Sequence, residues 1–223
     1  MASPSNSTLR MATATASPLS RRSLGAALLG TTVLAAAGCG INAPPARKLV
    51  LTPVASFPGG VRRVTWSLVV DEPGAGRQLD TSQIAVMDGA YRIEYYKEAE
   101  WADAAPAMIR DLLIQSFRNT GALPVVGSTR LGLYADVMLV STLTKFQVEP
   151  GPGNAPQAAV AIETALLQLP RRNPIATARF EKAIPIGEVV LEYVGSAFNE
   201  SLGDVMRRIV VWTLENGRTV ASG

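Results

Sequence analysis

Three β-strand patterns follow one another in the middle of this chain: DVMLVSTLTKFQV (136–148), AAVAIETALLQL (158–169) and ATARFEKAIPI (176–186). The turn-forming sequences PGPGN (150–154) and RRNP (171–174) separate them. Apolar and polar residues alternate in the third pattern, as they do in half-buried antiparallel strands, with Ala178, Phe180 and Ile184 on one face. We therefore predict an antiparallel meander of three strands.

A long amphipathic helix is predicted directly after this meander, over residues 190–215. Its apolar residues recur every three or four positions and form one stripe: Leu191, Val194, Phe198, Leu202, Val205, Ile209 and Trp212. Gly217 closes the helix. The stripe could face a partner, but a helix that covers a sheet explains it better, and we expect it to be core.

A shorter helix is predicted upstream, ending at Gly121 in a left-handed cap. Asp103 is the expected N-cap and Pro106 falls in the first turn, where its missing N–H costs little. The apolar stripe of this helix consists of Ile109, Leu112, Leu113 and Phe117.

Short strands are predicted around these elements, at residues 48–52, 63–70, 83–87, 91–97 and 125–126. The turn Asp88-Gly89 joins two of them into a hairpin. The predicted fold class is α/β of the α+β type: one two-layer domain over residues 48–217, with a mostly antiparallel sheet and two helices packed on one face.

The N-terminal region has the parts of a secretory signal. The basic pair Arg21-Arg22 precedes an apolar stretch (24–38) that ends in small residues. Cys39, the only cysteine of the chain, follows directly. This arrangement resembles the lipobox of bacterial lipoproteins, in which the cysteine thiol receives a diacylglycerol and the peptide is cut just before it. We expect a signal peptide at 1–38, lipidation at Cys39 and a lipidated tether at 39–47.

Alternatives for this region stay open. The sequence around Arg21 and Arg22 also resembles a twin-arginine export motif, so export follows either that route or the general secretory route. Translation starts at Met1 or at Met11, and the later start gives a signal of more usual length. Cleavage nearby would leave a free thiol. A spanning helix is disfavoured, because 24–38 is shorter than the ~20 apolar residues that a bilayer requires.

Charge and composition argue against several function classes. The chain has 21 Lys and Arg and 18 Asp and Glu residues, but Arg10, Arg21 and Arg22 fall in the predicted signal, which has no acidic residue. The mature chain is therefore formally neutral and offers no charge excess for nucleic acid. The chain has no histidine, the commonest general base and metal ligand. We expect no enzyme activity, no cofactor and no metal site.

Several ordered segments resemble the ABC-type transport auxiliary lipoprotein family, found beside lipid-trafficking transporters of the mammalian-cell-entry (MCE) kind in Gram-negative bacteria. They are LVLTP (49–53), WSLVVDEP (66–73), LDTSQIAV (79–86), Tyr91 leading to EWAD (100–103), and Ala135-Asp136 with Phe146 further on. The stretch YYKEAE (95–100) departs from the family pattern.

The resemblance implies a non-catalytic, periplasm-facing component of a system that moves lipids or other apolar molecules across the envelope. Its implied partners are an MCE-domain protein, the ABC permease and ATPase, and the membrane through the N-terminal lipid. A homo-oligomer stays open, because the sequence does not specify the oligomeric state. Trp101 and Tyr95 are candidate partner-binding residues. For Trp101 we favour the alternative, in which it packs as the hydrophobic residue before the helix.

The expected location is the inner leaflet of the outer membrane, because Gly40 rather than Asp follows the cysteine. The alternative function is a structural or regulatory envelope lipoprotein that binds a cell-wall or outer-membrane assembly partner. A periplasmic hydrolase is disfavoured by the missing histidine and nucleophile motif. The cargo and the partner-contact residues are not specified by the sequence.

Overall fold

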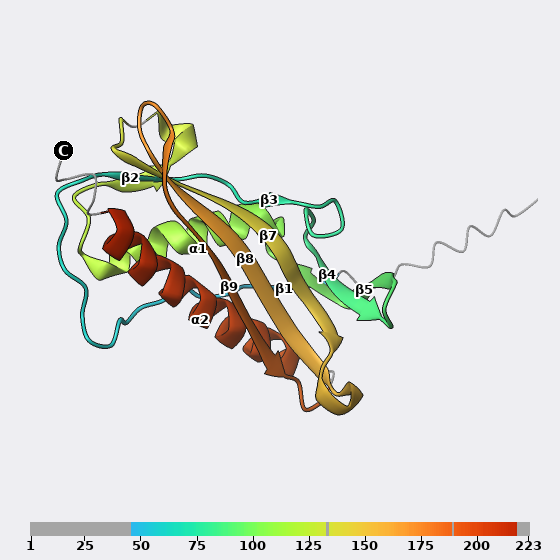
Figure 1. Ribbon diagram of the computed structural model, residues 1–223. Helices are drawn as coiled ribbons and strands as arrows, with labels where there is room; N and C mark the ends of the chain where they lie inside the picture. Colours follow the sequence, from blue (N-terminus) through green and yellow to red (C-terminus); the bar gives the residue numbers. More distant parts are fainter. Residues whose placement is uncertain (1–45, 133, 189, 218–223) are drawn as a thin grey trace, which may run out of the picture. The chain divides into compact units, whose positions relative to one another are not determined.

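The predicted meander forms the largest part of the sheet (Figure 1). In this computed structural model its strands are β7 (Val137–Pro150), β8 (Pro156–Gln168) and β9 (Asn173–Pro185), paired antiparallel with β8 in the middle. The first turn holds the 3-10 helix η2 (Pro152–Asn154), with Gly153 at φ 66°. The structure describes residues 46–132, 134–188 and 190–217. Arg21, Arg22 and Cys39 lie outside the described residues.

The N-terminal strands join the other edge of β7 in parallel. Strands β2 (Leu68–Val70), β3 (Gly74–Ala75) and β4 (Gln83–Asp88) pair with β7 in succession along its length. Residues 68–86 thus act as one interrupted strand, and Pro73, which cannot donate to a ladder, lies in one of its gaps. Sequence reasoning did not anticipate these parallel pairs, although the long pairs are antiparallel as predicted.

Three further strands complete a mixed sheet of nine strands. Strand β5 (Arg92–Trp101) pairs antiparallel with β4, and Gly89 at φ +68° makes the predicted hairpin turn between them. Strand β1 (Arg47–Leu49) pairs parallel with β5 at one edge, and β6 (Val126–Ser128), followed by the 3-10 helix η1 (Thr129–Leu131), pairs parallel with β2. The predicted strands at 48–52 and 63–70 are therefore shorter than expected.

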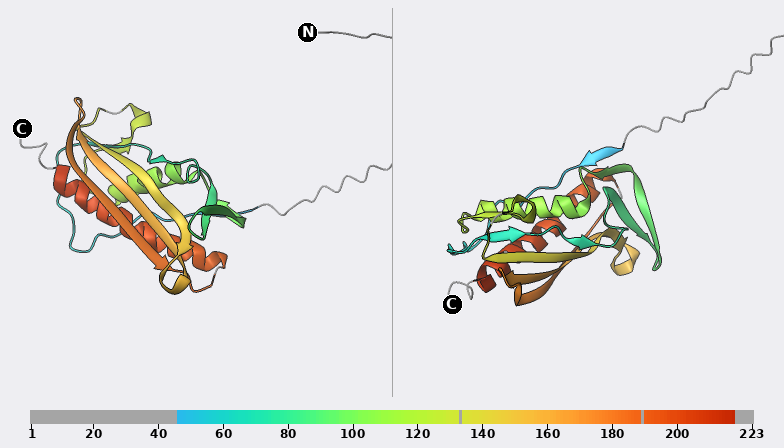
Figure 2. Two further views of the ribbon diagram at one scale, coloured as in Figure 1. Left: turned by 45° about the vertical axis from the view of Figure 1, so that its right-hand side comes forward. Right: turned by 90° about the horizontal axis from the view of Figure 1, so that it is seen from above.

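Both helices pack on one face of the sheet, so the predicted α+β two-layer architecture is confirmed (Figures 1 and 2). Helix α2 (Leu191–Asn216) contacts β8 and β9, and α1 (Ala105–Thr120) contacts β2, β6 and α2. All residues of the predicted α2 stripe are buried except Trp212, which is partly buried and packs against the core. The stripe is therefore core and not a partner face.

The N-terminus of α1 corrects one prediction. Ala104, not Asp103, is the N-cap residue, and no side chain caps the helix. Asp103 Oδ1 instead accepts a hydrogen bond from the N–H of Ala104 (2.7 Å). The first-turn N–H of Ala105 donates to the carbonyl of Thr81 (3.0 Å), so a neighbouring backbone replaces the capping side chain. Gly121 has φ 60° and forms the predicted left-handed C-cap.

The segment between β1 and β2 is held against both helices. The Thr52 N–H donates to Asn199 Oδ1 of α2 (2.8 Å), and the Val54 N–H donates to Ser116 Oγ of α1 (2.9 Å). This is why the predicted strand at 48–52 ends early: the backbone of Thr52 bonds a helix side chain and not a strand.

An aromatic cluster ties the two layers together. Trp101 of β5, Phe146 of β7 and Phe198 of α2 are completely buried. The Trp101 and Phe146 ring centroids lie 4.9 Å apart, and Phe198 lies 5.0 Å from each of them. Aromatic pairs at this separation add to the free energy of area burial alone.

Phe198→Ala should therefore destabilise the domain by about 3–5 kcal/mol, because it opens a cavity between three elements. Tyr193→Ala is a matched control on the same helix, since Tyr193 is 54% exposed and its loss should change stability little. Urea unfolding followed by circular dichroism measures both. Equal effects of the two substitutions would contradict the packing role of Phe198.

Candidate functional site

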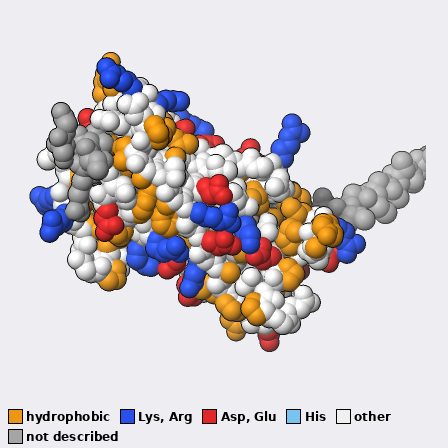
Figure 3. Space-filling view, in the orientation of Figure 1, with side chains coloured by type: hydrophobic (Ala, Val, Ile, Leu, Met, Phe, Trp, Pro, Cys, Tyr) orange, Lys and Arg blue, Asp and Glu red, His pale blue; other side chains and the backbone are white. Residues whose placement is uncertain are grey.

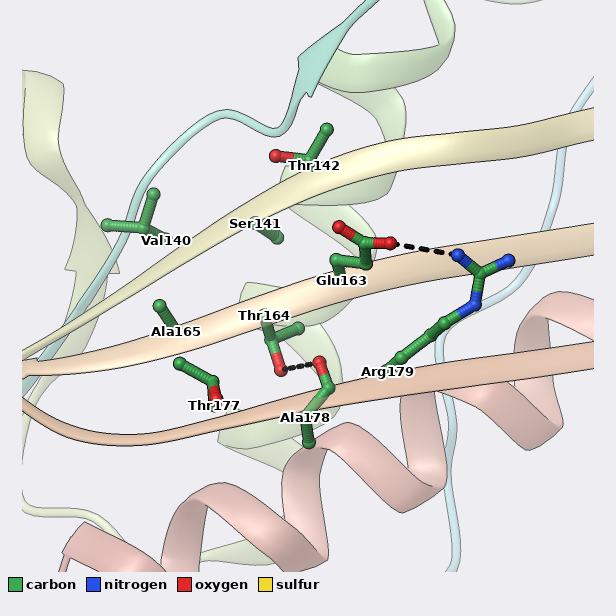
Figure 4. A pocket seen from close by; sticks show the side chains of 9 residues that line it. All are labelled: Val140, Ser141, Thr142, Glu163, Thr164, Ala165, Thr177, Ala178 and Arg179. Atoms are coloured by element: carbon green, nitrogen blue, oxygen red, sulfur yellow. Dashed lines mark hydrogen bonds and ion pairs between the residues drawn. The ribbon is translucent and has the colours of Figure 1, made fainter.

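The sheet face opposite the helices carries an open groove of about 450 Å³ on strands β7, β8 and β9 (Figure 4). Its lining residues are mostly small or polar: Val140, Ser141, Thr142, Glu163, Thr164, Ala165, Thr177, Ala178 and Arg179. We call this surface the β7–β9 groove. It is the candidate binding site of the domain.

Strand alternation explains why these side chains share the groove. Val140 pairs with Ala165, and Ala165 pairs with Thr177, so their side chains form one cross-strand row. Thr142, Glu163 and Arg179 form the next row on the same face. Short side chains in the first row beside a long charged pair in the second leave the surface hollowed.

Charged side chains on this face are held in a ladder of ion pairs. Arg179 contacts Glu163 (Nη1–Oε1, 2.8 Å) and Glu181 (Nη2–Oε2, 3.0 Å). Lys145 Nζ lies 3.1 Å from a carboxylate oxygen of Glu181 and 3.1 Å from one of Glu149. Figure 3 shows basic and acidic side chains next to one another over this face. The ladder presents both signs of charge.

The ladder also sets the protonation of its members. Hydrogen bonds from Lys145 and then from Arg179 lower the pKa of Glu181, although burial opposes this. Burial disfavours the charged form of Lys145, but hydrogen bonds to Glu181 and Glu149 outweigh it and raise the pKa of the ammonium group. These two groups therefore keep their charges at neutral pH.

The polar side chains of the groove are engaged by their neighbours. Its carboxylate, Glu163, is engaged by Arg179, and its Thr164 hydroxyl donates to the carbonyl of Ala178 (3.2 Å). Within the described residues, no three His, Cys, Asp or Glu side chains are grouped so that they could hold a metal ion. Among the described helices, none has the length and apolar character needed to span a membrane.

The predicted site residues lie away from this groove. Trp101 belongs to the aromatic cluster and has no exposed surface, so it cannot contact a partner without leaving the core. Tyr95 is half-buried on β5, and its hydroxyl donates weakly to the carbonyl of Gln78 (3.4 Å). The groove could not be predicted from the sequence. It forms where a cross-strand row of short side chains lies beside a row that holds a charged pair, and such rows join residues from three separate strands.

Acidic residues of the motif segments support the fold. Glu72 Oε2 accepts contacts from the buried Arg110 of α1 and from Arg130 of η1. Its neighbour Asp71 accepts a hydrogen bond from the Thr129 hydroxyl (2.9 Å). The end of β2 is thereby fastened to helix α1 and to the segment after β6.

Asp136 has the same kind of role at the start of β7. Its Oδ2 accepts hydrogen bonds from the N–H (2.7 Å) and the hydroxyl (2.8 Å) of Ser67, just before β2. The backbone hydrogen bond first, and the hydroxyl second, lower the pKa of Asp136. This carboxylate therefore fixes where β2 and β7 begin to pair.

Comparison with known proteins places this two-layer domain among envelope transport components. The family model for the ABC-type transport auxiliary lipoprotein component matches residues 49–210. The chain belongs to this family: it is an auxiliary lipoprotein component of an ABC-type transport system. The family is not a known enzyme family, and as a lipoprotein family it implies lipid anchoring in the cell envelope.

Solved structures share the fold of this domain. The crystal structure of protein XCC0632 from Xanthomonas campestris is 25% identical, with a TM-score of 0.69, over 80% of this chain and 99% of that one. The crystal structure of an uncharacterized protein is 13% identical, with a TM-score of 0.57, over 74% and 97% of the two chains. The second likeness concerns the fold alone. None of the curated proteins compared with this sequence matches it.

Asp136→Ala should reduce stability at neutral pH by about 1 kcal/mol, as expected for hydrogen bonds to a charged group near the surface. A carboxyl group whose pKa is lower in the folded state stabilises the fold at every pH above its unfolded-state pKa. This stabilisation is lost as the pH falls through the folded-state pKa. The difference from wild type should therefore shrink as pH falls from 3.8 through the lowered pKa.

Urea unfolding at pH 7, 5 and 3 measures this difference, with Asp80→Ala as the control because Asp80 is an exposed aspartate. An equal loss of stability for Asp136→Ala at pH 3 and pH 7 would contradict the role assigned to its charge.

Proposed function

We propose that this protein is the lipid-anchored, non-catalytic component that connects an envelope membrane to an MCE-domain protein, whose ABC permease and ATPase move lipids or other apolar molecules. The family membership gives the transport class. The single observation that supports a docking role within this class is the β7–β9 groove, which lies on a sheet face that neither helix covers.

The anchor is proposed at Cys39, after export directed by the signal at 1–38 with Arg21 and Arg22. Acyl chains on the thiol and on the new N-terminus would supply two attachment points, where a single chain gives only marginal binding. The tether 39–47 then leads to the domain at 48–217. We place the protein on the inner leaflet of the outer membrane, facing the periplasm, because Gly40 follows the cysteine.

The partner surface is proposed to be the β7–β9 groove. A partner segment could lie along its row of small residues while its polar groups meet the ion-pair ladder. The mature chain is formally neutral, so shape and apolar contact rather than net charge should dominate association. Moderate salt should therefore weaken the complex little.

Cys39→Ala should abolish acylation and leave the protein uncleaved or soluble. Membrane fractionation and mass spectrometry of the N-terminal peptide measure this outcome. Ala36→Leu is the control, because leucine three residues before the cysteine strengthens a lipobox and should preserve processing. A free thiol at Cys39 in the wild-type protein, or cleavage at another site, would remove the lipid anchor from the proposal.

Thr142→Trp should block the β7–β9 groove without breaking its ion pairs, since Thr142 is exposed and tryptophan is favoured in strands. Gln168→Trp is the matched control at the exposed end of β8, outside the groove. Tagged, lipidated full-length protein purified from its own cells should recover an MCE-domain protein with its permease and ATPase. Thr142→Trp should lose this complex, and Gln168→Trp should keep it.

Deletion phenotypes give an independent readout of the same proposal. Loss of this protein and loss of the recovered transporter should weaken the envelope barrier equally, and the double deletion should be no worse than either. Additive phenotypes without any recovered transporter would leave the structural or regulatory lipoprotein as the function.

A further inference from the structure

The hairpin of β4 and β5 projects beyond the rest of the sheet (Figure 2). Strand β4 pairs with β7 only at Ala85 and Val86, and β1 pairs with β5 only from Ala99 to Trp101. In the described part of the chain, residues 87–97 therefore have no strand beside them except their own hairpin partner. The two strands pair there through Met87–Ile93 and Asp88–Arg92.

One face of this projecting hairpin is apolar at its tip. Tyr91, in the turn just before β5, is 98% exposed, and Ile93 is 36% exposed on the same face of β5 as Tyr95. Met87 lies directly across from Ile93 on that face. Figure 3 shows hydrophobic side chains over this end of the molecule. A stripe of exposed apolar side chains on a protruding element indicates a contact surface.

Strand β1 brings the start of the domain to this same end. It runs parallel to β5, with Arg47 opposite Ala99, so the first residue of β1 lies at the end of that strand nearer the hairpin tip. Figure 2 shows β1 and the hairpin at one end of the domain. The described chain therefore starts at the end of the domain that carries the hairpin.

Chain lengths turn this shared direction into a constraint. Cys39 precedes Arg47 by eight residues, which span at most about 27 Å when fully extended and about 16 Å on average as a flexible coil. On β4, Asp88 lies five residues beyond Gln83, which pairs with Glu100 at the level of Lys48, so the end of β4 lies about 17 Å along the strand from that level. This length is close to the average span of the tether and within its extended span, so the anchor and the hairpin tip can reach the same surface.

We propose that the apolar face of the β4–β5 hairpin rests in the lipid interface of the membrane that holds the anchor. This inference rests on the proposed acylation of Cys39. An anchor at that distance draws the tip of the hairpin into the membrane surface, and the domain is thereby oriented with β1 toward the lipid. Tyrosine suits this place, because its ring is apolar and its hydroxyl remains hydrated.

Charges near the tip indicate that the contact is apolar and not electrostatic. Asp88 and Arg92 form an ion pair with each other. Glu94, Lys97 and Glu98 follow on β5, and Arg47 and Lys48 lie on β1, with Lys48 paired to Glu100. Both signs are present in equal number in this set of eight, so anionic lipid gives no general attraction. The contact should form on zwitterionic vesicles and persist in salt.

Tyr134 provides a matched reference position. It is fully exposed, as Tyr91 is. It precedes the first residue of β7, whereas β4 joins β7 near the last residues of that strand. The 14 residues of β7 separate the two ends by roughly 45 Å. A probe at Tyr134 therefore reports the end of the domain away from the proposed membrane contact.

The test uses lipidated full-length protein in phosphatidylcholine–phosphatidylethanolamine vesicles. Tyr91→Cys and Tyr134→Cys each add one thiol for an environment-sensitive fluorophore, since Cys39 is blocked by its acyl group. Both positions are exposed, so neither substitution threatens folding. Headgroup spin-labelled lipid should quench the probe at 91, with a blue shift of its emission, and leave the probe at 134 unchanged at low and moderate salt.

Other outcomes overturn the proposal in distinguishable ways. Protein that floats with the vesicles but shows equal, weak quenching at both positions keeps the lipid anchor and removes the hairpin contact. A change at 91 that appears only on addition of the MCE-domain protein would make the hairpin a partner contact instead. Protein that fails to float removes the anchor of the proposed function and the hairpin contact with it.

Discussion

The packing of Trp101, Phe146 and Phe198 is the constraint on which the rest of the domain depends. The three rings come from β5, β7 and α2, and each contacts the other two. They join the hairpin, the meander and the closing helix at one point, and such contacts between distant parts of the chain contribute most when they are fully buried. With α2 held there, α1 takes the remaining part of the same face, and the segment around Thr52 and Val54 bonds to both helices.

Because one face is taken by helices, the other is left to the strands alone. Small residues and ion pairs on β7, β8 and β9 keep that face soluble, and their uneven size produces the groove. This is the surface that we propose as the docking site for the partner, and membership of an auxiliary component family implies association with an ABC transporter. Among the motif residues, Asp136 holds the start of the β2–β7 pairing through Ser67, whereas Asp71 and Glu72 hold the end of β2 to the segment after β6 and to α1.

The direction of β1 gives the domain a polarity with functional meaning. Had β1 joined β5 antiparallel, its N-terminal end would lie away from the hairpin tip. Parallel pairing through Arg47 and Ala99 instead directs the start of the domain and the exposed Tyr91 to one end. The β7–β9 groove lies on the face of the sheet opposite the helices. With the proposed anchor at Cys39, this arrangement would let the hairpin end contact the membrane while the groove stays available to the proposed partner.

The sequence by itself determined the elements whose signal is local: the long strands of the meander, both helices, the turn at Gly89 and the left-handed cap at Gly121. Periodicity and backbone preference act within a few residues, so they can be read without knowing the neighbours. Only the tertiary structure decided the parallel pairing of β2, β3 and β4 with β7, the end of the predicted 48–52 strand at Leu49, and the capping of α1 by Thr81 instead of Asp103. It also decided that Trp101 is core and that Thr142, Glu163 and Arg179 share a groove, because burial and cross-strand rows depend on contacts between residues far apart in the chain.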